Sequence, residues 1–211
     1  MPSAEPRPGA GPMRIFLAGA TGVLGIRILR LLLAEGHTVA AMTRSPGKAG
    51  HLRELGASPV ICDVFDAAAL AAAVTGFKPD AVMHQLTDLP DQAGDLTAFA
   101  ARNDRIRTEG TRNLVAAATA ARTRYFLAQS IAWRLSGRGA VIDEHESRVL
   151  AVGGVVVRYG QLYGPGTFYE DHVPEPPRIH VDTAARATPP LIQAPSGVVL
   201  LTEETEALGT Q

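Results

Sequence analysis

Met13–Gly25 has the sequence MRIFLAGATGVLG and carries the strongest indication of the fold in this chain. Arg14–Ala18 is a short run rich in Ile, Phe and Leu, which predicts a buried strand. Gly19–Gly25 follows as a tight turn with a glycine at every third position. Over Val23–Glu35 the apolar residues recur at helical spacing, which predicts a helix. A strand, a glycine turn and a helix in this order give the glycines a defined structural context.

This turn predicts a dinucleotide site, because each glycine has a physical role there. One permits the sharp turn, one lets the backbone approach a pyrophosphate, and one lets the helix pack on the strand. The phosphates would bind the N–H groups at the helix start, where the peptide dipoles favour negative charge. At Gly22 we expect a Cβ to intrude on either the phosphate or the required backbone angle. The residues of the turn expected at the cofactor are Gly19, Thr21, Gly22, Val23, Leu24 and Gly25. A glycine-rich structural turn is the alternative, since 21 of the 211 residues are glycine.

Composition restricts the class of protein. A hydrophobic content of 46% suits one well-packed domain, and a formal net charge of −1 argues against nucleic-acid or anionic-membrane partners. No apolar run approaches the length of a membrane span, and the start lacks the pattern of a secretory signal. The single cysteine, Cys62, lies in an apolar run and is expected to be an inert core thiol in a reducing compartment. We therefore expect a soluble cytoplasmic protein.

Strands and helices alternate along most of the chain. After Arg14–Ala18, the expected strands are His37–Thr43, Ser58–Cys62, Asp80–His84, Tyr125–Gln129 and Gly154–Arg158. The expected helices between them are Gly47–Leu55, Ala67–Val74, capped by Asp66 and closed by Gly76, and an Ala-rich stretch from about Ala93 to Ala120. This alternation predicts right-handed parallel crossovers, and hence a doubly wound parallel α/β sheet covered on both faces.

The two ends and the C-terminal third differ from this pattern. Residues 1–12 are rich in Pro and Gly and are expected to form a disordered leader, followed by a single domain over 13–201 and a flexible acidic tail over 202–211. Beyond Arg158 periodicity fades, which predicts a reduced, partly irregular C-terminal cap. Its expected elements are a strand at Arg178–Val181, a helix at Thr183–Gln193 interrupted by Pro189-Pro190, and a last strand at Val198–Leu201.

Five separate motifs carry a resemblance to a known family. They are GATGVLG, CDVFD at Cys62–Asp66, EGTRNLVAAA at Glu109–Ala118, RYGQLYGPG at Arg158–Gly166 and IHVDTAARA at Ile179–Ala187. In this order they resemble the extended short-chain dehydrogenase/reductases, the NAD-dependent epimerase/dehydratase family, whose fold is Rossmann-like. The resemblance implies that Asp63, with Val64, lies at the adenine. It also implies that His84 lies beside the nicotinamide, and that Ser130 of the AQSIAW segment is the catalytic serine.

The choice between NAD and NADP can be argued from charge at the end of the second strand. An acidic residue there hydrogen-bonds the ribose 2′-hydroxyl, whereas a basic residue accommodates a 2′-phosphate. Arg44 follows that strand and Lys48 is nearby. The planar fork of arginine suits phosphate, so we expect NADP over NAD. A solvated surface arginine is the alternative for Arg44.

The sequence departs from the family at its proton-transfer residues. The family uses a tyrosine four residues before a lysine, but this chain has no lysine after Lys78. The helix expected to carry that pair would lie between Ile142 and Ala151, where the sequence suffices for two turns. Candidate substitutes are His145, Glu144 and His84, each of which is more commonly a solvated or core residue. The spacing of His172 and His180 with Asp171 and Asp182 fits no defined metal-ligand set, so no metal is expected.

Two functions from different classes remain open at this point. One is an NADP-dependent oxidoreductase or epimerase/dehydratase-like enzyme acting on a small carbonyl or sugar-type substrate through Ser130 and an unidentified acid. The other is a redox-inactive dinucleotide-binding sensor or partner-binding module, which the missing tyrosine–lysine pair favours. A remnant left by an internal deletion is a third reading. The substrate is unknown, and a homodimer is one open assembly.

Overall fold

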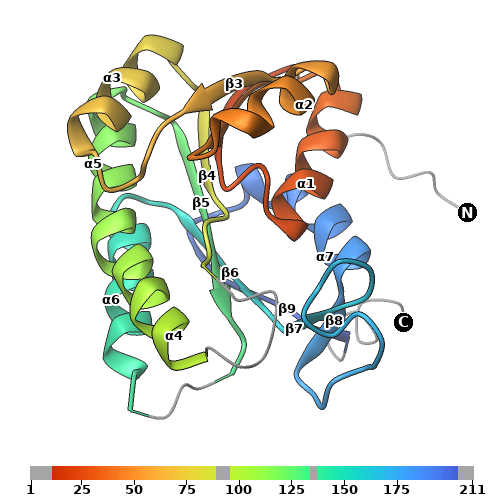
Figure 1. The fold of residues 1–211 in the computed structure, drawn as a ribbon. Helices are drawn as coiled ribbons and strands as arrows, with labels where there is room; N and C mark the ends of the chain where they lie inside the picture. Colours follow the sequence, from red (N-terminus) through yellow and green to blue (C-terminus); the bar gives the residue numbers. More distant parts are fainter. Residues whose placement is uncertain (1–10, 89–95, 134–136, 204–211) are drawn as a thin grey trace, which may run out of the picture.

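The computed structural model describes residues 11–88, 96–133 and 137–203. Seven parallel strands form one sheet in the order β3-β2-β1-β4-β5-β6-β9 (Figure 1). Their bounds are β1 (Arg14–Ala18), β2 (Thr38–Thr43), β3 (Ser58–Ile61), β4 (Ala81–His84), β5 (Tyr125–Ile131), β6 (Val155–Tyr159) and β9 (Gly197–Leu201). A separate two-stranded parallel sheet pairs β7 (Gln161–Tyr163) with β8 (Arg178–His180). The predicted doubly wound α/β class is therefore confirmed.

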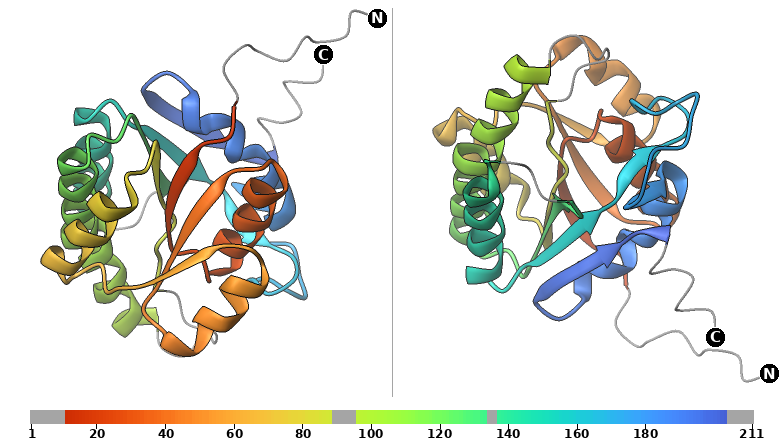
Figure 2. Two further views of the ribbon diagram at one scale, coloured as in Figure 1. Left: turned by 90° about the horizontal axis from the view of Figure 1, so that it is seen from above. Right: turned by 90° about the horizontal axis from the view of Figure 1, so that it is seen from below.

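Helices cover both faces of the large sheet (Figures 1 and 2). One face carries α1 (Val23–Ala34), α2 (Ala49–Glu54) and α7 (Val181–Ala187). The other carries α3 (Ala67–Phe77), α4 (Leu96–Arg105), a π-helix at Ile106–Gly110 that continues into α5 (Thr111–Ala120), and α6 (Gly139–Ala151). Short 3₁₀ helices lie at Pro46–Lys48 and Pro189–Gln193.

The central strand β1 shows why the sheet needs cover on both sides. Ile15 and Leu17 pack into the cluster under α1 and α7, whereas Phe16 and Ala18 pack into the cluster under α3 and α5. All four side chains are fully buried, and successive residues of a strand point to opposite faces. A continuous apolar run therefore describes a strand enclosed from both sides. The strand order reverses between β1 and β4, which places the switch point of the fold beside the glycine turn.

Most predicted elements lie where the sequence indicated, with three corrections. The Asp66 cap is confirmed by its side-chain bond to the Ala69 N–H at 3.0 Å, but closure of this helix at Gly76 is wrong. The helix runs to Phe77 and ends at Lys78, which adopts the left-handed φ of 52°. Arg14 stacks on the Phe77 ring and binds its carbonyl, which fixes this last turn.

The other two corrections lie in the second half of the chain. The helix α6 has 13 residues, more than the two turns expected there, because its buried positions recur at helical spacing. The strand β7 was not predicted, since its three residues carry no alternating pattern. The expected leader and tail lie largely outside the described residues, as does the start of the helix predicted from Ala93.

Candidate functional site

Two glycines of the turn after β1 are required by close packing. Gly19 has φ of +90°, and a Cβ there would lie 2.4 Å from the Gln85 carbonyl oxygen. A Cβ on Gly25 would lie 2.0 Å from the Gly19 carbonyl oxygen. Real Cβ atoms do not approach other heavy atoms so closely, so a side chain at either position would force the turn apart. Gly19 lets the turn pass close to the segment after β4, and Gly25 lets the start of α1 pack closely on the turn.

Gly22 differs from its two neighbours in the motif. Its φ of −74° and ψ of 165° are open to any residue, so the expected demand on its backbone angle is wrong. A Cβ there would meet only the Gly19 carbonyl oxygen, at an ordinary 3.4 Å. The fold itself therefore does not require glycine at this position. The other half of the expectation, that a Cβ at Gly22 would intrude on a bound phosphate, stays a prediction.

The start of α1 is a suitable anion site. Gly22 is its N-cap, no side chain hydrogen-bonds the cap, and no acidic residue stands in the first turn. The first N–H groups of a helix have no partner within the helix, and they carry partial positive charge. Arg27 of the same helix binds the Pro165 carbonyl at 2.7 Å, which brings the Gly164–Gly166 loop against the start of α1. Thr21 lies in this turn, and Val23 and Leu24 are the first two residues of α1. Their contact with the cofactor stays a prediction.

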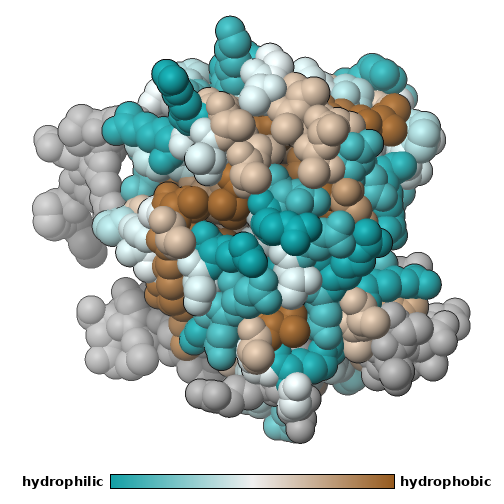
Figure 3. Space-filling view, turned by 90° about the vertical axis from the view of Figure 1, so that its left-hand side faces the viewer, coloured by the Kyte–Doolittle hydropathy of each residue, from teal (hydrophilic) through white to brown (hydrophobic). Residues whose placement is uncertain are grey.

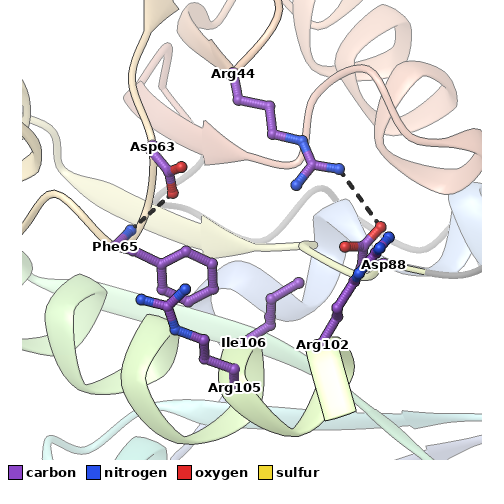
Figure 4. Close-up of a pocket in the computed structure, with 7 residues that line it drawn as sticks. All are labelled: Arg44, Asp63, Phe65, Asp88, Arg102, Arg105 and Ile106. Atoms are coloured by element: carbon purple, nitrogen blue, oxygen red, sulfur yellow. Dashed lines mark hydrogen bonds and ion pairs between the residues drawn. The ribbon is translucent and has the colours of Figure 1, made fainter. Parts of the chain in front are cut away.

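A hollow of about 290 Å³ lies beside the carboxyl ends of β2 and β4 (Figure 4). It brings together Arg44 and Asp63, two of the residues expected at the cofactor. The full lining is Arg44, Asp63, Phe65, Asp88, Arg102, Arg105 and Ile106. Asp63 accepts a hydrogen bond from the Phe65 N–H at 2.9 Å, and Arg105 stacks on the Phe65 ring. Val64 points into the core, and its carbonyl accepts from Asn113 at 3.0 Å.

His84 belongs to a buried chain of hydrogen bonds. Its Nδ1 accepts from the Leu86 N–H at 3.3 Å, and its Nε2 lies 3.0 Å from Thr111 Oγ1. That hydroxyl lies 2.7 Å from His145 Nδ1, and His145 Nε2 lies 2.9 Å from the Gln129 carbonyl oxygen. A carbonyl only accepts, so His145 carries its proton on Nε2 and takes the Thr111 proton at Nδ1. Thr111 must then accept from the Nε2–H of His84.

His84 and His145, the two histidines of this hydrogen-bond network, are neutral at neutral pH. Burial, together with the nearby His145 and Arg107, holds the pKa of His84 well below its usual value. Burial also lowers the pKa of His145, outweighing its bond to Gln129. The side chain of His84 is 1% exposed and both its ring nitrogens are occupied, which does not support the expected contact with a nicotinamide.

Ser130 also lies inside the protein, at the carboxyl end of β5. Its hydroxyl donates to Glu146 Oε1 at 2.6 Å, and Arg158 holds the same carboxylate through bonds of 2.9 and 2.5 Å. Burial alone would raise the pKa of Glu146, but the bonds from Arg158 and Ser130 outweigh it and hold the pKa below its usual value. The carboxylate is therefore ionised, and it accepts a hydrogen bond from the hydroxyl proton of Ser130. In this arrangement the serine presents an acceptor lone pair to a ligand, and its proton points to Glu146.

Glu146 is a buried partner of Ser130 that the sequence interpretation missed. The sequence analysis named Glu144 and His145 of this helix as candidate proton donors. Glu144 is partly exposed and paired with Arg148 at 2.8 Å. A signal was available, because Ile142, His145, Glu146 and Val149 share the buried face of α6. A glutamate on an apolar helix face is uncommon unless it has a partner. Asp88, Arg102 and Arg105 of the hollow were also missed.

The tyrosines and histidines of the C-terminal part contact other side chains and backbone groups of the same chain. Tyr163 contacts the His180 ring and donates to Glu203, and Tyr169 donates to Gln161 at 2.9 Å. The bond to Glu203 raises the pKa of Tyr163. His180 accepts from the Asp182 N–H at the start of α7. Within residues 11–88, 96–133 and 137–203 no group of three metal-type ligands gathers, and no helix could cross a membrane.

Comparison with known proteins fits this geometry. A family model described as NAD(P)H-binding matches residues 19–138. A 3-diazoavenalumate denitrifying reductase from a Streptomyces species is 37% identical over 182 residues, which span 74% of this chain and 59% of that protein. This chain thus spans well under two thirds of that relative.

Solved structures share the fold at low sequence identity. UDP-glucose 4-epimerase of Thermotoga maritima superimposes with a TM-score of 0.74 at 16% identity, over 90% of this chain and 77% of that one. The enzyme WbmG of Bordetella bronchiseptica, solved with NAD, gives a TM-score of 0.71 at 19% identity, over 93% of this chain and 74% of that one. The resemblance to the epimerase/dehydratase fold is therefore confirmed.

Proposed function

This chain belongs to the NAD(P)H-binding family, and on that premise we propose that it is an NADPH-dependent reductase. We further propose that its substrate accepts a hydride without taking a proton from the protein. The observation that carries this proposal is the state of Ser130, whose only proton is held by the ionised Glu146.

The residues present fit a dinucleotide. The Cβ position of Gly22 is open, so this glycine is explained by a ligand that approaches the backbone at the start of α1. Asp63 and Arg44 face one hollow, where they would hold the adenosine end (Figure 4). Arg44 supports NADP over NAD because its guanidinium suits a 2′-phosphate, and its side chain is 68% exposed and open to a ligand.

Among the residues that the structure describes, no proton donor suited to carbonyl chemistry is presented at this site. Reduction of a carbonyl produces an alkoxide, which a positioned acid must protonate, and such acids contribute about a hundred- to ten-thousandfold in rate. The chain has no lysine after Lys78 to form the family's tyrosine–lysine pair. Within the described part of the chain, Ser130 is bound to Glu146 and His145 is buried and neutral. A small carbonyl or sugar-type substrate is therefore a poorer match than the sequence suggested.

A substrate that already carries positive charge needs no such donor. The Streptomyces relative is named a denitrifying reductase of 3-diazoavenalumate, so its name describes a diazo compound that is reduced with loss of nitrogen. For this chain we propose an arenediazonium ion as the substrate class. The chemistry that bound NADPH supplies is a hydride, so that a C–H bond forms, the C–N bond breaks, and dinitrogen leaves with both electrons. Charge and atoms balance without a proton.

A redox-inactive dinucleotide sensor is the second candidate, because the same satisfied side chains suit a site that performs no chemistry. Turnover separates the two candidates. A cytoplasmic location and a homodimer remain predictions. The outer face of the α3–α6 layer mixes apolar residues with hydrophilic ones, so the surface itself does not decide the assembly (Figure 3).

The test is NADPH consumption with a benzenediazonium salt, a small aldehyde and a sugar as substrates. We expect consumption with the diazonium salt alone, and one dinitrogen released per NADPH. Gly22→Val is the control variant, because it should fold normally yet lose dinucleotide binding and turnover. Efficient aldehyde or sugar reduction would overturn the proposed substrate class. Tight NADPH binding without any turnover would favour the sensor.

A further inference from the structure

Asp88 holds a fixed position at the rim of the hollow. It follows β4, and its backbone is clamped by the buried Asn103, which accepts from the Asp88 N–H at 3.0 Å and donates to its carbonyl at 2.6 Å. Both bonds use the backbone of Asp88, so they leave its carboxylate free to act. The side chain is only 13% exposed and points across the hollow (Figure 4).

That carboxylate points at Arg44. Asp88 Oδ1 lies 3.4 Å from Arg44 Nη2, which is a long contact for an ion pair. Arg44 is mostly exposed, so the attraction is weak and its guanidinium stays available. The two side chains come from the segments that follow β2 and β4, and they meet over the space where the 2′ position of the adenosine ribose is expected.

The charges around the hollow are nearly balanced. Its lining holds three guanidinium groups, from Arg44, Arg102 and Arg105, against the carboxylates of Asp63 and Asp88. Arg105 is already paired with Glu109 at 2.7 Å. A phosphate bound by Arg44 would therefore have the Asp88 carboxylate as a close neighbour of like charge.

We propose that Asp88 is a specificity-determining residue that limits the preference of this site for NADPH over NADH. This inference rests on the proposed use of Arg44 for the 2′-phosphate. The carboxylate competes with the phosphate for Arg44 and repels it. With NADH the same carboxylate meets a hydroxyl, to which it can offer a hydrogen-bond acceptor. The balance of Arg44 and Asp88 thus leaves the site open to both cofactors.

The opposite role would be preorganisation, in which Asp88 holds Arg44 ready for the phosphate. The geometry favours competition, because a single contact of 3.4 Å fixes a mostly exposed guanidinium poorly. The two roles predict opposite signs for removal of the charge. Competition predicts tighter binding of NADPH, and preorganisation predicts weaker binding.

The experiment measures the affinities of NADPH and NADH by calorimetry for the wild-type chain, Asp88→Asn and Asp63→Asn. Asparagine keeps the size of the side chain and the backbone clamp. For Asp88→Asn we expect the NADPH-to-NADH affinity ratio to rise about three- to tenfold, less at high salt because exposed charges are screened. Asp63→Asn removes the same charge from the same hollow at the expected adenine position, so it should leave the ratio unchanged.

The outcomes separate this inference from the proposed function. A wild-type preference for NADPH with an unchanged or reduced ratio in Asp88→Asn would overturn the role of Asp88 alone. An equal rise in both variants would show a general charge effect and would also overturn it. A wild-type chain that binds NADH better, or binds neither cofactor, would overturn the NADPH assignment and the inference with it.

Discussion

The two halves of the large sheet differ in how their polar groups are used. In the half built from β1, β2 and β4, the start of α1 is uncapped and Arg44 is exposed beside a hollow. In the half built from β5 and β6, Ser130 donates to Glu146, which Arg158 holds in turn. The first half presents an exposed guanidinium and a helix start without a side-chain cap, whereas Ser130, Glu146 and Arg158 of the second half bind one another.

Cofactor binding and proton transfer can therefore be separated within one fold. A parallel sheet positions the cofactor through backbone geometry at its switch point, which the glycine turn alone can provide. In the family that the motifs resemble, proton transfer uses a tyrosine and a lysine on a later helix, whereas α6 carries Glu146 and His145 on its buried face. We therefore expect the protein to hold a hydride donor, while the part of the chain that the structure describes does not present the groups that usually protonate the product.

The largest effect is expected from separating the two roles of the glycine turn. Gly25→Ala should prevent stable folding, because its Cβ would lie 2.0 Å from the Gly19 carbonyl oxygen. Gly22→Ala should leave the unfolding free energy nearly unchanged but weaken NADPH roughly ten- to hundredfold, through lost phosphate contacts worth about 1.5–3 kcal/mol. Thermal unfolding and calorimetry measure both. Equal loss of stability in the two variants would remove the argument for a ligand at Gly22.

The buried histidines predict a dependence of stability on pH. Their folded pKa values are lowered, so the unfolded state binds protons first as the pH falls below about 6.5. The contribution of these histidines to the free energy of unfolding is therefore fully present above that pH and is lost on acidification. Each histidine lowers the free energy of unfolding by roughly 1 kcal/mol for each pH unit. Denaturant unfolding at several pH values measures this. Imidazole nitrogen shifts should show both rings neutral and protonated on Nε2; a charged ring at neutral pH would contradict the chain of bonds.

A smaller effect is expected for Arg44, the exposed arginine that lines the hollow. Arg44→Ala should weaken NADPH roughly ten- to hundredfold, the value of a charge-assisted contact, and leave NADH nearly unchanged. Arg53→Ala on α2 is a matched control, since it also removes an exposed guanidinium but does not line the hollow. Equal losses for both cofactors in Arg44→Ala would show that this residue does not recognise the phosphate.

The smallest effect is expected at Ser130. With its proton held by Glu146, this serine does not act as an acid, so Ser130→Ala should lower turnover with a diazonium salt by less than about tenfold, far below the loss typical of a general acid. Steady-state kinetics of the variant measure this. A hundredfold loss with unchanged cofactor affinity would return Ser130 to a direct role in the reaction.

Sequence patterns predicted the fold better than the site, for physical reasons. Arg14–Ala18 and the glycine turn are local signals, and the capping bond of Asp66 spans three residues. The partnership of Ser130 with Glu146 and Arg158 depends on how α6 packs against β5 and β6, which no local pattern reveals. Asp88 came together with Arg44 only through the pairing of strands far apart in the sequence. The open Cβ position of Gly22 follows from the three-dimensional shape of the turn, which the glycine spacing alone does not reveal.

The most direct test of the account is the pH profile of kcat/KM for a benzenediazonium salt with saturating NADPH. A hydride transfer that needs no proton from the protein predicts a flat profile between about pH 6 and about pH 8, with no solvent deuterium isotope effect. A profile that follows a titrating group, together with aldehyde reduction at rates on the order of 1–1,000 per second, would contradict it.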